Sequence, residues 1–168
     1  MNIKLALVVA LSFAPLTFGF AHANCVTDDP TELAKAFYAK HVDFHFENPA
    51  KIESIVTPRL LSALTREYKC AKGNICAIEA VPWTDAQDGD VGKPIAFQTT
   101  ENSEVQASVK MSYTFVLSKT QKRQQSVLLK FQRSSTNECW LLSDMISPRG
   151  VSLVTHIEKW HKKFGDVR

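Results

Sequence analysis

The sequence predicts an α+β fold, with N-terminal helices packed on a curved antiparallel sheet of four to five strands and a C-terminal helix. Three observations support this prediction. Helix start signals and helical spacing of apolar residues occupy positions 29–70, two-residue alternation dominates positions 95–145, and a helical apolar stripe returns at 153–164. Helices that precede a run of neighbouring strands are typical of α+β domains, in which the helices cover one face of the sheet.

A secretory signal peptide is predicted at the amino terminus. Lys4 makes a short positive region, residues 5–20 are almost wholly apolar, and Ala21-His22-Ala23 places small residues where a signal peptidase needs them. The apolar run is shorter than the roughly 20 residues of a membrane-spanning helix. We therefore expect cleavage after Ala23, a periplasmic product, and one domain over residues 24–168.

Two helices are predicted in the first half of the mature chain. Asp29-Pro30 supplies an N-cap acceptor followed by proline in the first turn, and apolar side chains on one face continue this helix to about Phe46. Asn48-Pro49 and Thr57-Pro58 repeat the start signal. Leucines at helical spacing after the second of these predict an amphipathic helix that ends near Cys70.

Strands are predicted from about residue 95 onward. A short strand is expected over 95–99, and "ECWLLSDM" ends the series. The stretch "EVQASVKMSYTFVL" alternates between apolar and polar residues, and after the polar turn "KTQKRQQ" the alternation resumes. The apolar residues expected to face the core are Val105, Ala107, Val109, Met111, Tyr113, Phe115 and Leu117, then Val127, Leu129 and Phe131.

A final amphipathic helix is predicted from the spacing of Leu153, Ile157, Trp160 and Phe164. Lysines and a glutamate occupy its other face, which we expect to be exposed to solvent.

All four cysteines lie in the part of the chain expected to be exported. An even number of cysteines in an oxidising compartment predicts two disulfides. A turn at Gly73-Asn74 would bring Cys70 and Cys76 together, which leaves Cys25 to pair with Cys139. The alternative, a redox or metal site, lacks a CxxC motif and a histidine at ligand spacing from a cysteine pair.

Charge and motifs exclude several classes of function. Without Lys4 the chain has 19 Lys+Arg (20 less one) against 17 Asp+Glu, a balance that does not indicate a nucleic-acid binder. Neither GxGxxG nor GxxxxGK[ST] occurs, and "GVSLV" is not GxSxG. We therefore expect no cofactor and no catalytic residue. Basic residues at Lys119, Lys122 and Arg123 are typical of a solvated turn, or of a patch that meets an acidic partner.

The stretch "PWTDAQDGDVGKP" is the main candidate for a binding loop. It is either a solvated loop of Asx-turns, a calcium loop, or a loop that contacts a partner protein. The calcium alternative lacks the closing glutamate of that motif. Because tryptophan is enriched in interface hot spots, the candidate partner-binding residues are Trp83, Asp85, Gln87, Asp88 and Asp90.

Two further sets of residues bear on chemistry. His41 and His45 stand four apart on the first predicted helix, a zinc-like spacing that lacks the glutamate of the zinc-protease motif, so no metal is predicted. An interior pocket of an α+β cone could still use an Asp base and a Tyr donor. The residues that could occupy it are Tyr38, Asp43, Tyr68, Tyr113 and Asp144.

Three stretches resemble a bacterial envelope family of unknown function with an NTF2-like cone fold: "TPRLLSALTREY", "PWTDAQDGD" and "CWLLSDMISPRGVSLVTHIEKW". The resemblance covers roughly residues 30–164. It implies helices cupped by a curved sheet, and it carries over no catalytic residue. Many members of that family are lipoproteins, whereas Asn24 here stands where a lipobox has a small residue.

These observations lead to an expected function. We expect a periplasmic, non-enzymatic domain that binds another protein, either an immunity-type inhibitor of a secreted toxin or cell-wall hydrolase, or an accessory subunit of an envelope complex. The alternatives are a small-ligand carrier and a cone-pocket enzyme of NTF2-like type. A cone filled with large side chains would favour protein binding, and a deep, partly polar cavity would favour the alternatives.

Overall fold

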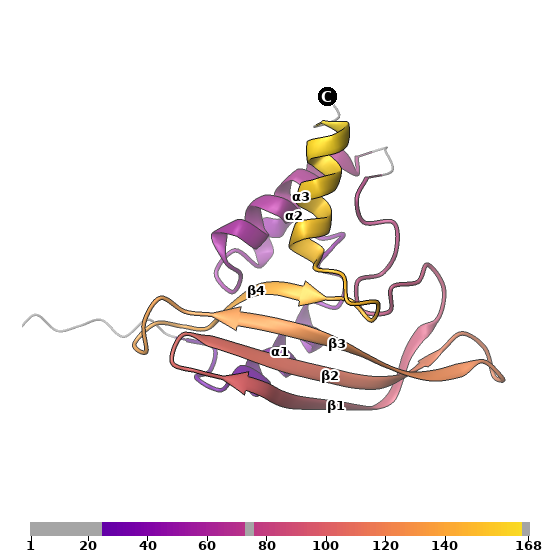
Figure 1. Ribbon diagram of the computed structural model, residues 1–168, viewed down its shortest axis with the longest axis horizontal. Helices are drawn as coiled ribbons and strands as arrows, with labels where there is room; N and C mark the ends of the chain where they lie inside the picture. Colours follow the sequence, from indigo (N-terminus) through magenta and orange to yellow (C-terminus); the bar gives the residue numbers. More distant parts are fainter. Residues whose placement is uncertain (1–24, 73–75, 166–168) are drawn as a thin grey trace, which may run out of the picture.

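The computed structural model describes residues 25–72 and 76–165, so the predicted signal peptide and the Gly73-Asn74 turn lie outside the described residues. The predicted α+β class is confirmed (Figure 1). The sheet is an antiparallel meander in the order β1-β2-β3-β4. Its strands and the three α-helices are α1 (Pro30–Lys40), α2 (Pro58–Cys70), β1 (Asp90–Asn102), β2 (Gln106–Val116), β3 (Lys122–Gln132), β4 (Leu141–Ile146) and α3 (Leu153–Phe164).

Helix α1 begins where the sequence predicts and ends earlier. The Asp29 carboxylate accepts a hydrogen bond from the Thr31 amide at 2.7 Å and caps the helix. The prediction that the helix continues to Phe46 is wrong, because turns replace it after Lys40. These turns direct Phe44 into the core, 5.4 Å from the ring of Phe37, and leave Phe46 exposed. Tertiary packing therefore overrides the local helical pattern.

The two other proline start signals have different outcomes. Thr57 caps α2, and the helix runs to Cys70 as predicted. Asn48 caps only a short 3₁₀ turn, η1 (Pro49–Lys51). The chain between these two elements then runs along the sheet edge, where the Thr57 amide donates to Leu142 O at 2.9 Å. That contact covers the edge of β4, which would otherwise expose unpaired backbone groups.

The alternating stretch forms β2, and its inward face is nearly as predicted. Val109, Met111 and Tyr113 are buried, whereas Val105 and Leu117 lie beyond the ends of the strand and are exposed, contrary to prediction. Strand β1 is much longer than the predicted 95–99, because its pairing with β2 extends across two irregularities in register. Such irregularities accommodate a segment that contains Pro94, which has no backbone N–H to donate.

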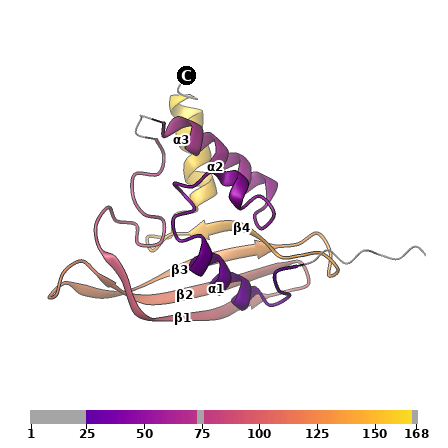
Figure 2. The same cartoon turned by 180° about the vertical axis from the view of Figure 1, so that it is seen from behind.

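The helices occupy two places around the sheet. Helix α1 packs against β1 and β2, and it lies behind the sheet in Figure 1 and in front of it in Figure 2. Helices α2 and α3 pack on one another beside β4. The exposed Arg59 guanidinium joins them through two hydrogen bonds to Glu158, at 2.9 and 2.7 Å, and lowers the pKa of that carboxyl. None of the described helices has both the length and the apolarity to cross a bilayer.

Large aromatic side chains fill the space between α1 and the sheet. Trp83 is fully buried and lies 4.9 Å from the ring of Tyr38 and 5.9 Å from the ring of Phe44. Tyr113 and Phe131 close the same core from the sheet. Aromatic groups of this size dominate the apolar area that a small domain buries, and here they leave the interior filled.

Both predicted disulfide pairings are confirmed. Cys25 bonds to Cys139, and Cys70 bonds to Cys76. The first ties the start of the described chain to the turn before β4, where the Trp140 indole also donates to Asp28 O at 3.1 Å. The second closes the segment directly after α2.

Helix α3 confirms the predicted boundaries, with Ser152 as its N-cap, but not the whole predicted stripe. Leu153 and Ile157 are buried, whereas Trp160 is half-buried and Phe164 is exposed. His161 takes the last buried position of the helix. This position accommodates histidine because the carboxylate of Glu67 on α2 lies 3.2 Å from its Nε2.

Candidate functional site

The site is built on the connector, the segment of residues 76–89 that joins α2 to β1. The side chain of Glu67 is buried, and its carboxylate accepts hydrogen bonds from the Ala77 amide at 3.2 Å and the Ile78 amide at 2.7 Å. His161 Nε2 lies 3.2 Å from the same carboxylate. On the other side, His156 Nε2 donates to Ala77 O at 2.8 Å. The connector is therefore held to both helices from the Cys70–Cys76 bond onward.

Farther along, the connector folds into a tight loop over residues 81–86. Val81 and Ala86 form a bridge, and Asp85 has φ 54°, a left-handed conformation that aspartate tolerates better than most residues. The buried Trp83 indole donates to Val42 O at 2.7 Å. The expectation that Trp83 is an exposed contact residue is therefore wrong. Trp83 instead anchors the loop, because burying its large apolar ring lowers the free energy of the folded chain.

Asp85 pairs with Arg149, which lies in the turn between β4 and α3. The two groups form a bidentate ion pair, with Arg149 Nη2 2.6 Å from Asp85 Oδ1, and the Ser147 hydroxyl donates to Asp85 at 3.0 Å. The hydrogen bond from Arg149 holds the pKa of the Asp85 carboxyl below its usual range. The carboxylate is thus ionised and fixed in place at the surface.

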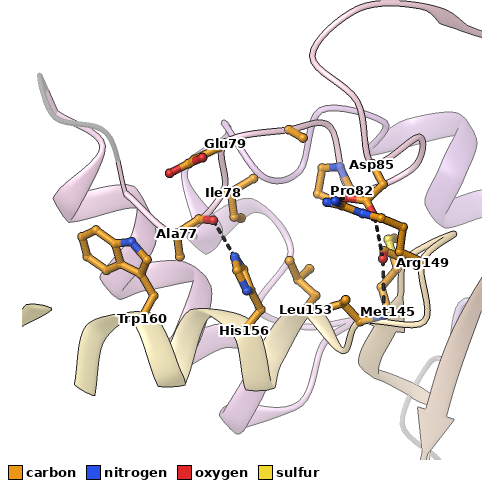
Figure 3. A pocket seen from close by; sticks show the side chains of 13 residues that line it. Ala77, Ile78, Glu79, Pro82, Asp85, Met145, Arg149, Leu153, His156 and Trp160 are labelled. Atoms are coloured by element: carbon orange, nitrogen blue, oxygen red, sulfur yellow. Dashed lines mark hydrogen bonds and ion pairs between the residues drawn. The ribbon is translucent and has the colours of Figure 1, made fainter. Parts of the chain in front are cut away.

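A cleft of about 380 Å³ lies between the connector and α3 (Figure 3). Met145 and Leu153 form its buried floor, Trp160 stands at one end, and the Asp85–Arg149 pair stands at the other. Val151 is exposed on its rim. Its lining residues are Ala77, Ile78, Glu79, Ala80, Pro82, Asp85, Met145, Ser147, Arg149, Val151, Leu153, His156 and Trp160.

The other predicted binding residues have different positions. Gln87 is exposed, and its amide donates to Glu79 O at 3.3 Å, which ties the connector back on itself. Asp88 is exposed, and Asp90 is the exposed first residue of β1. Of the five predicted residues, only Asp85 lines the cleft.

Several lining residues come from segments that sequence reasoning did not single out for binding. Arg149 and Val151 flank Gly150 in a turn whose positive φ of 80° suits glycine. The motif "SPRG" signals a turn, but the pairing of Arg149 with a residue 64 positions away has no local signature. His156 and Trp160 lie on α3 one turn apart, on the side that faces the connector (Figure 3).

The cleft does not have the geometry of a nucleophile and its base. The Ser147 hydroxyl bonds to Asp85, and the His156 imidazole donates to a backbone carbonyl, so the two are not hydrogen-bonded to each other. Two of the residues considered for a cone-pocket enzyme, Tyr113 and Asp144, have structural partners. The Tyr113 hydroxyl donates to Trp83 O, and burial raises its pKa to about 12. Asp144 caps α3 by accepting hydrogen bonds from Ser152 at 2.6 Å and from the Val154 amide at 3.1 Å.

The candidate histidine pair does not share a helix face. His41 is the C-cap of α1, and His45 lies in the turns beyond it. His45 is buried, and neither ring nitrogen makes a hydrogen bond to the described residues. Among the residues that the structure describes, no three His, Cys, Asp or Glu side chains are grouped as a metal site.

Burial of His45 has a consequence for stability at low pH. Desolvation lowers its pKa to about 4, against the smaller opposing effect of Asp43. Between pH 6.5 and about pH 4 the imidazole is protonated in the unfolded chain and neutral in the folded chain. The free energy of unfolding therefore decreases as the pH is lowered through this range. We expect this group to remove about 2 kcal/mol of the free energy of unfolding between about pH 7.5 and pH 5.

Urea denaturation at several pH values measures this loss. The His45→Leu variant has no titrating group at this position, so its free energy of unfolding should fall less over the same range. Equal pH slopes for the variant and the wild type would contradict the assignment, whatever the difference in their absolute stabilities.

Taken together, the cleft offers an apolar floor, a fixed ion pair at one end and a half-buried indole at the other. A surface of this kind can accept an inserted side chain, a short segment or a small molecule. Comparison with known protein families, curated proteins and solved structures gives no match for this chain.

Proposed function

We propose that this protein is an exported, non-enzymatic domain that works by docking onto another protein in the periplasm. Its concrete forms are an immunity-type inhibitor of a secreted toxin or cell-wall hydrolase, and an accessory subunit of an envelope complex. The proposal includes the NTF2-like cone as the finer fold and membership of the envelope family that the sequence resembles.

The filled interior is the observation that carries this proposal. A carrier or a cone-pocket enzyme needs space between the helices and the concave face of the sheet. Phe37, Phe44, Trp83 and Tyr113 occupy that space and are almost fully buried. Recognition is therefore assigned to the outer surface, where the cleft lies.

The walls of the cleft support protein docking, because they are held rigidly before any partner arrives. A disulfide, the buried Glu67 carboxylate and the Asp85–Arg149 pair fix the connector. A preorganised surface loses little conformational entropy on binding. Val151 and Trp160 supply accessible apolar area next to the fixed polar groups, and protein interfaces likewise combine an apolar centre with a polar rim.

A capture experiment with matched variants tests the proposal. The mature protein, residues 24–168, is expected to retain a stoichiometric protein partner from periplasmic extract. Val151→Asp should reduce capture about tenfold, because it places a charge in an apolar contact. Phe46→Asp is the control: Phe46 is 67% exposed and Val151 43% exposed, so both variants should fold, and Phe46 does not line the cleft.

The outcomes separate protein docking from the carrier function. Recovery of no stoichiometric protein by the wild type would contradict docking. Equal capture by the two variants would show that the cleft is not part of the interface. A small molecule retained by the periplasmic protein in native mass spectrometry would favour the carrier, which is the alternative that the cleft volume of about 380 Å³ also permits.

A further inference from the structure

A second, polar hollow lies on the other side of the Asp85–Arg149 pair, with a volume of about 730 Å³. Lys110, Arg123 and Arg149 line it, and Asp85 is the carboxylate among its lining residues. Since Asp85 is already paired with Arg149, the hollow carries two surplus positive charges. Among the ion pairs of the described residues, none involves Lys110 or Arg123.

The Arg123 guanidinium is positioned by a chain of hydrogen bonds that starts in the core. A phenol has one proton, and Tyr113 donates it to Trp83 O. Gln125 must then present its amide nitrogen to Tyr113 at 3.1 Å and its oxygen to Arg123 Nε at 3.0 Å. The guanidinium also lies 5.1 Å from the Phe115 ring. Its remaining N–H donors are left for a ligand, and carboxylates are suited to accept from them.

The hollow also lies beside an unoccupied strand edge. Strand β4 pairs with β3 only over Leu128–Gln132, while β3 begins at Lys122. No described strand or isolated bridge pairs with residues 122–127 on that side. Figure 1 shows the β2–β3 hairpin continuing well past the end of β4. An open edge of this kind accepts the backbone of an added strand.

We infer that the hollow binds an acidic, extended segment of the protein partner, whose backbone lies along β3 at residues 122–127 and whose carboxylates contact Lys110 and Arg123. This rests on the proposed docking function and names the chemistry of the partner. The open strand edge favours a polypeptide over a nucleic acid, which has no amide groups to pair with it. The lining residues also include no aromatic ring on which a base could stack.

A defined probe tests the inference without the natural partner. Lys110 and Arg123 lie on opposite faces of the sheet, so the probe is a fluorescent ten-residue peptide built from Asp-Asp-Thr repeats, which carries carboxylates on both sides of an extended chain. Its binding is measured by anisotropy at low ionic strength. The double variant Lys110→Glu/Arg123→Glu should weaken its binding at least about tenfold. The control Lys159→Glu/Lys162→Glu makes the same change in net charge at exposed positions on α3 and should weaken binding less than about twofold.

Equal weakening by the two double variants would overturn the inference, because binding would then depend on net charge alone. Tighter binding of a ten-nucleotide oligothymidine than of the peptide would overturn it as well.

The natural partner gives the second test, with a photocrosslinker in place of Gln124 in the hollow. The crosslinked segment of the captured protein should carry several Asp or Glu residues. A partner captured but crosslinked through a neutral or basic segment would overturn the inference and leave the docking function standing. Failure to capture any partner, with the peptide still bound at the hollow, would contradict the docking function alone.

Discussion

Replacing Cys25 and Cys139 together by serine is expected to lower the free energy of unfolding by about 4–5 kcal/mol. The bond joins residues 114 positions apart, so its loss frees most of the described chain in the unfolded state. Since small domains are stabilised by only about 5–15 kcal/mol, the variant should be close to unfolding at physiological temperature. Urea denaturation of the oxidised wild type and the variant measures the difference.

The Cys70→Ser/Cys76→Ser variant is the matched control, because it also removes one disulfide. Its bond spans a sequence separation of 6, for which the same chain-entropy relation gives about 2 kcal/mol. Equal losses for the two double variants would show that chain entropy is not the source of the stabilisation.

Replacing Glu67 by glutamine is expected to lower the free energy of unfolding by about 2–4 kcal/mol. The buried carboxylate accepts from the Ala77 and Ile78 amides and faces His161. The two amides bond different carboxylate oxygens, and glutamine has an NH₂ donor in place of one of them, so one backbone N–H loses its acceptor. Removing one member of a buried polar network costs more than the network contributes as a whole.

Two measurements make this prediction specific. Glu53→Gln changes an exposed glutamate and should alter the free energy of unfolding by less than about 0.5 kcal/mol. Hydrogen exchange at the Ala77 and Ile78 amides should accelerate in the Glu67 variant, since these are the groups that lose their acceptor. Unchanged exchange at both amides would show that the carboxylate does not hold the connector.

The expected loss on replacing Glu67 bears on function through the connector. Glu67 and the Cys70–Cys76 bond fix its first residues, and Trp83 fixes its loop in the core. The cleft and the basic hollow share the Asp85–Arg149 pair between them. A partner that contacts both would therefore meet a surface whose geometry is set before binding, which favours affinity.

Local signals in the sequence predicted the regular elements well. Asp29 and Thr57 cap helices because their side-chain oxygens reach amides two or three residues away, and such contacts are encoded in adjacent positions. The alternation that forms β2 has the same local origin. Two predictions failed where distant contacts decided the local structure. The first helix ends at Lys40 and not at Phe46, and β1 is longer than 95–99 because it pairs with β2 along its length.

The candidate site was predicted less well, because its residues meet only in the folded chain. The loop of residues 81–86 was identified from its Trp and Asp content, yet Trp83 points into the core and Asp85 is paired. The Arg123 chain through Gln125 and Tyr113 joins neighbouring strands and could not be found in either strand alone.

By itself, the sequence determined the α+β class and most helix and strand positions, since helix caps and apolar periodicity depend on residues close together in the chain. It also determined the disulfide partners, because the close spacing of Cys70 and Cys76 leaves one pairing for the other two cysteines. Only the tertiary structure decided which side of the Trp83 loop faces solvent, where the cleft and the basic hollow open, and which charges remain unpaired. Those features depend on contacts between residues tens of positions apart, and the burial of one large side chain decides which of its neighbours stay exposed.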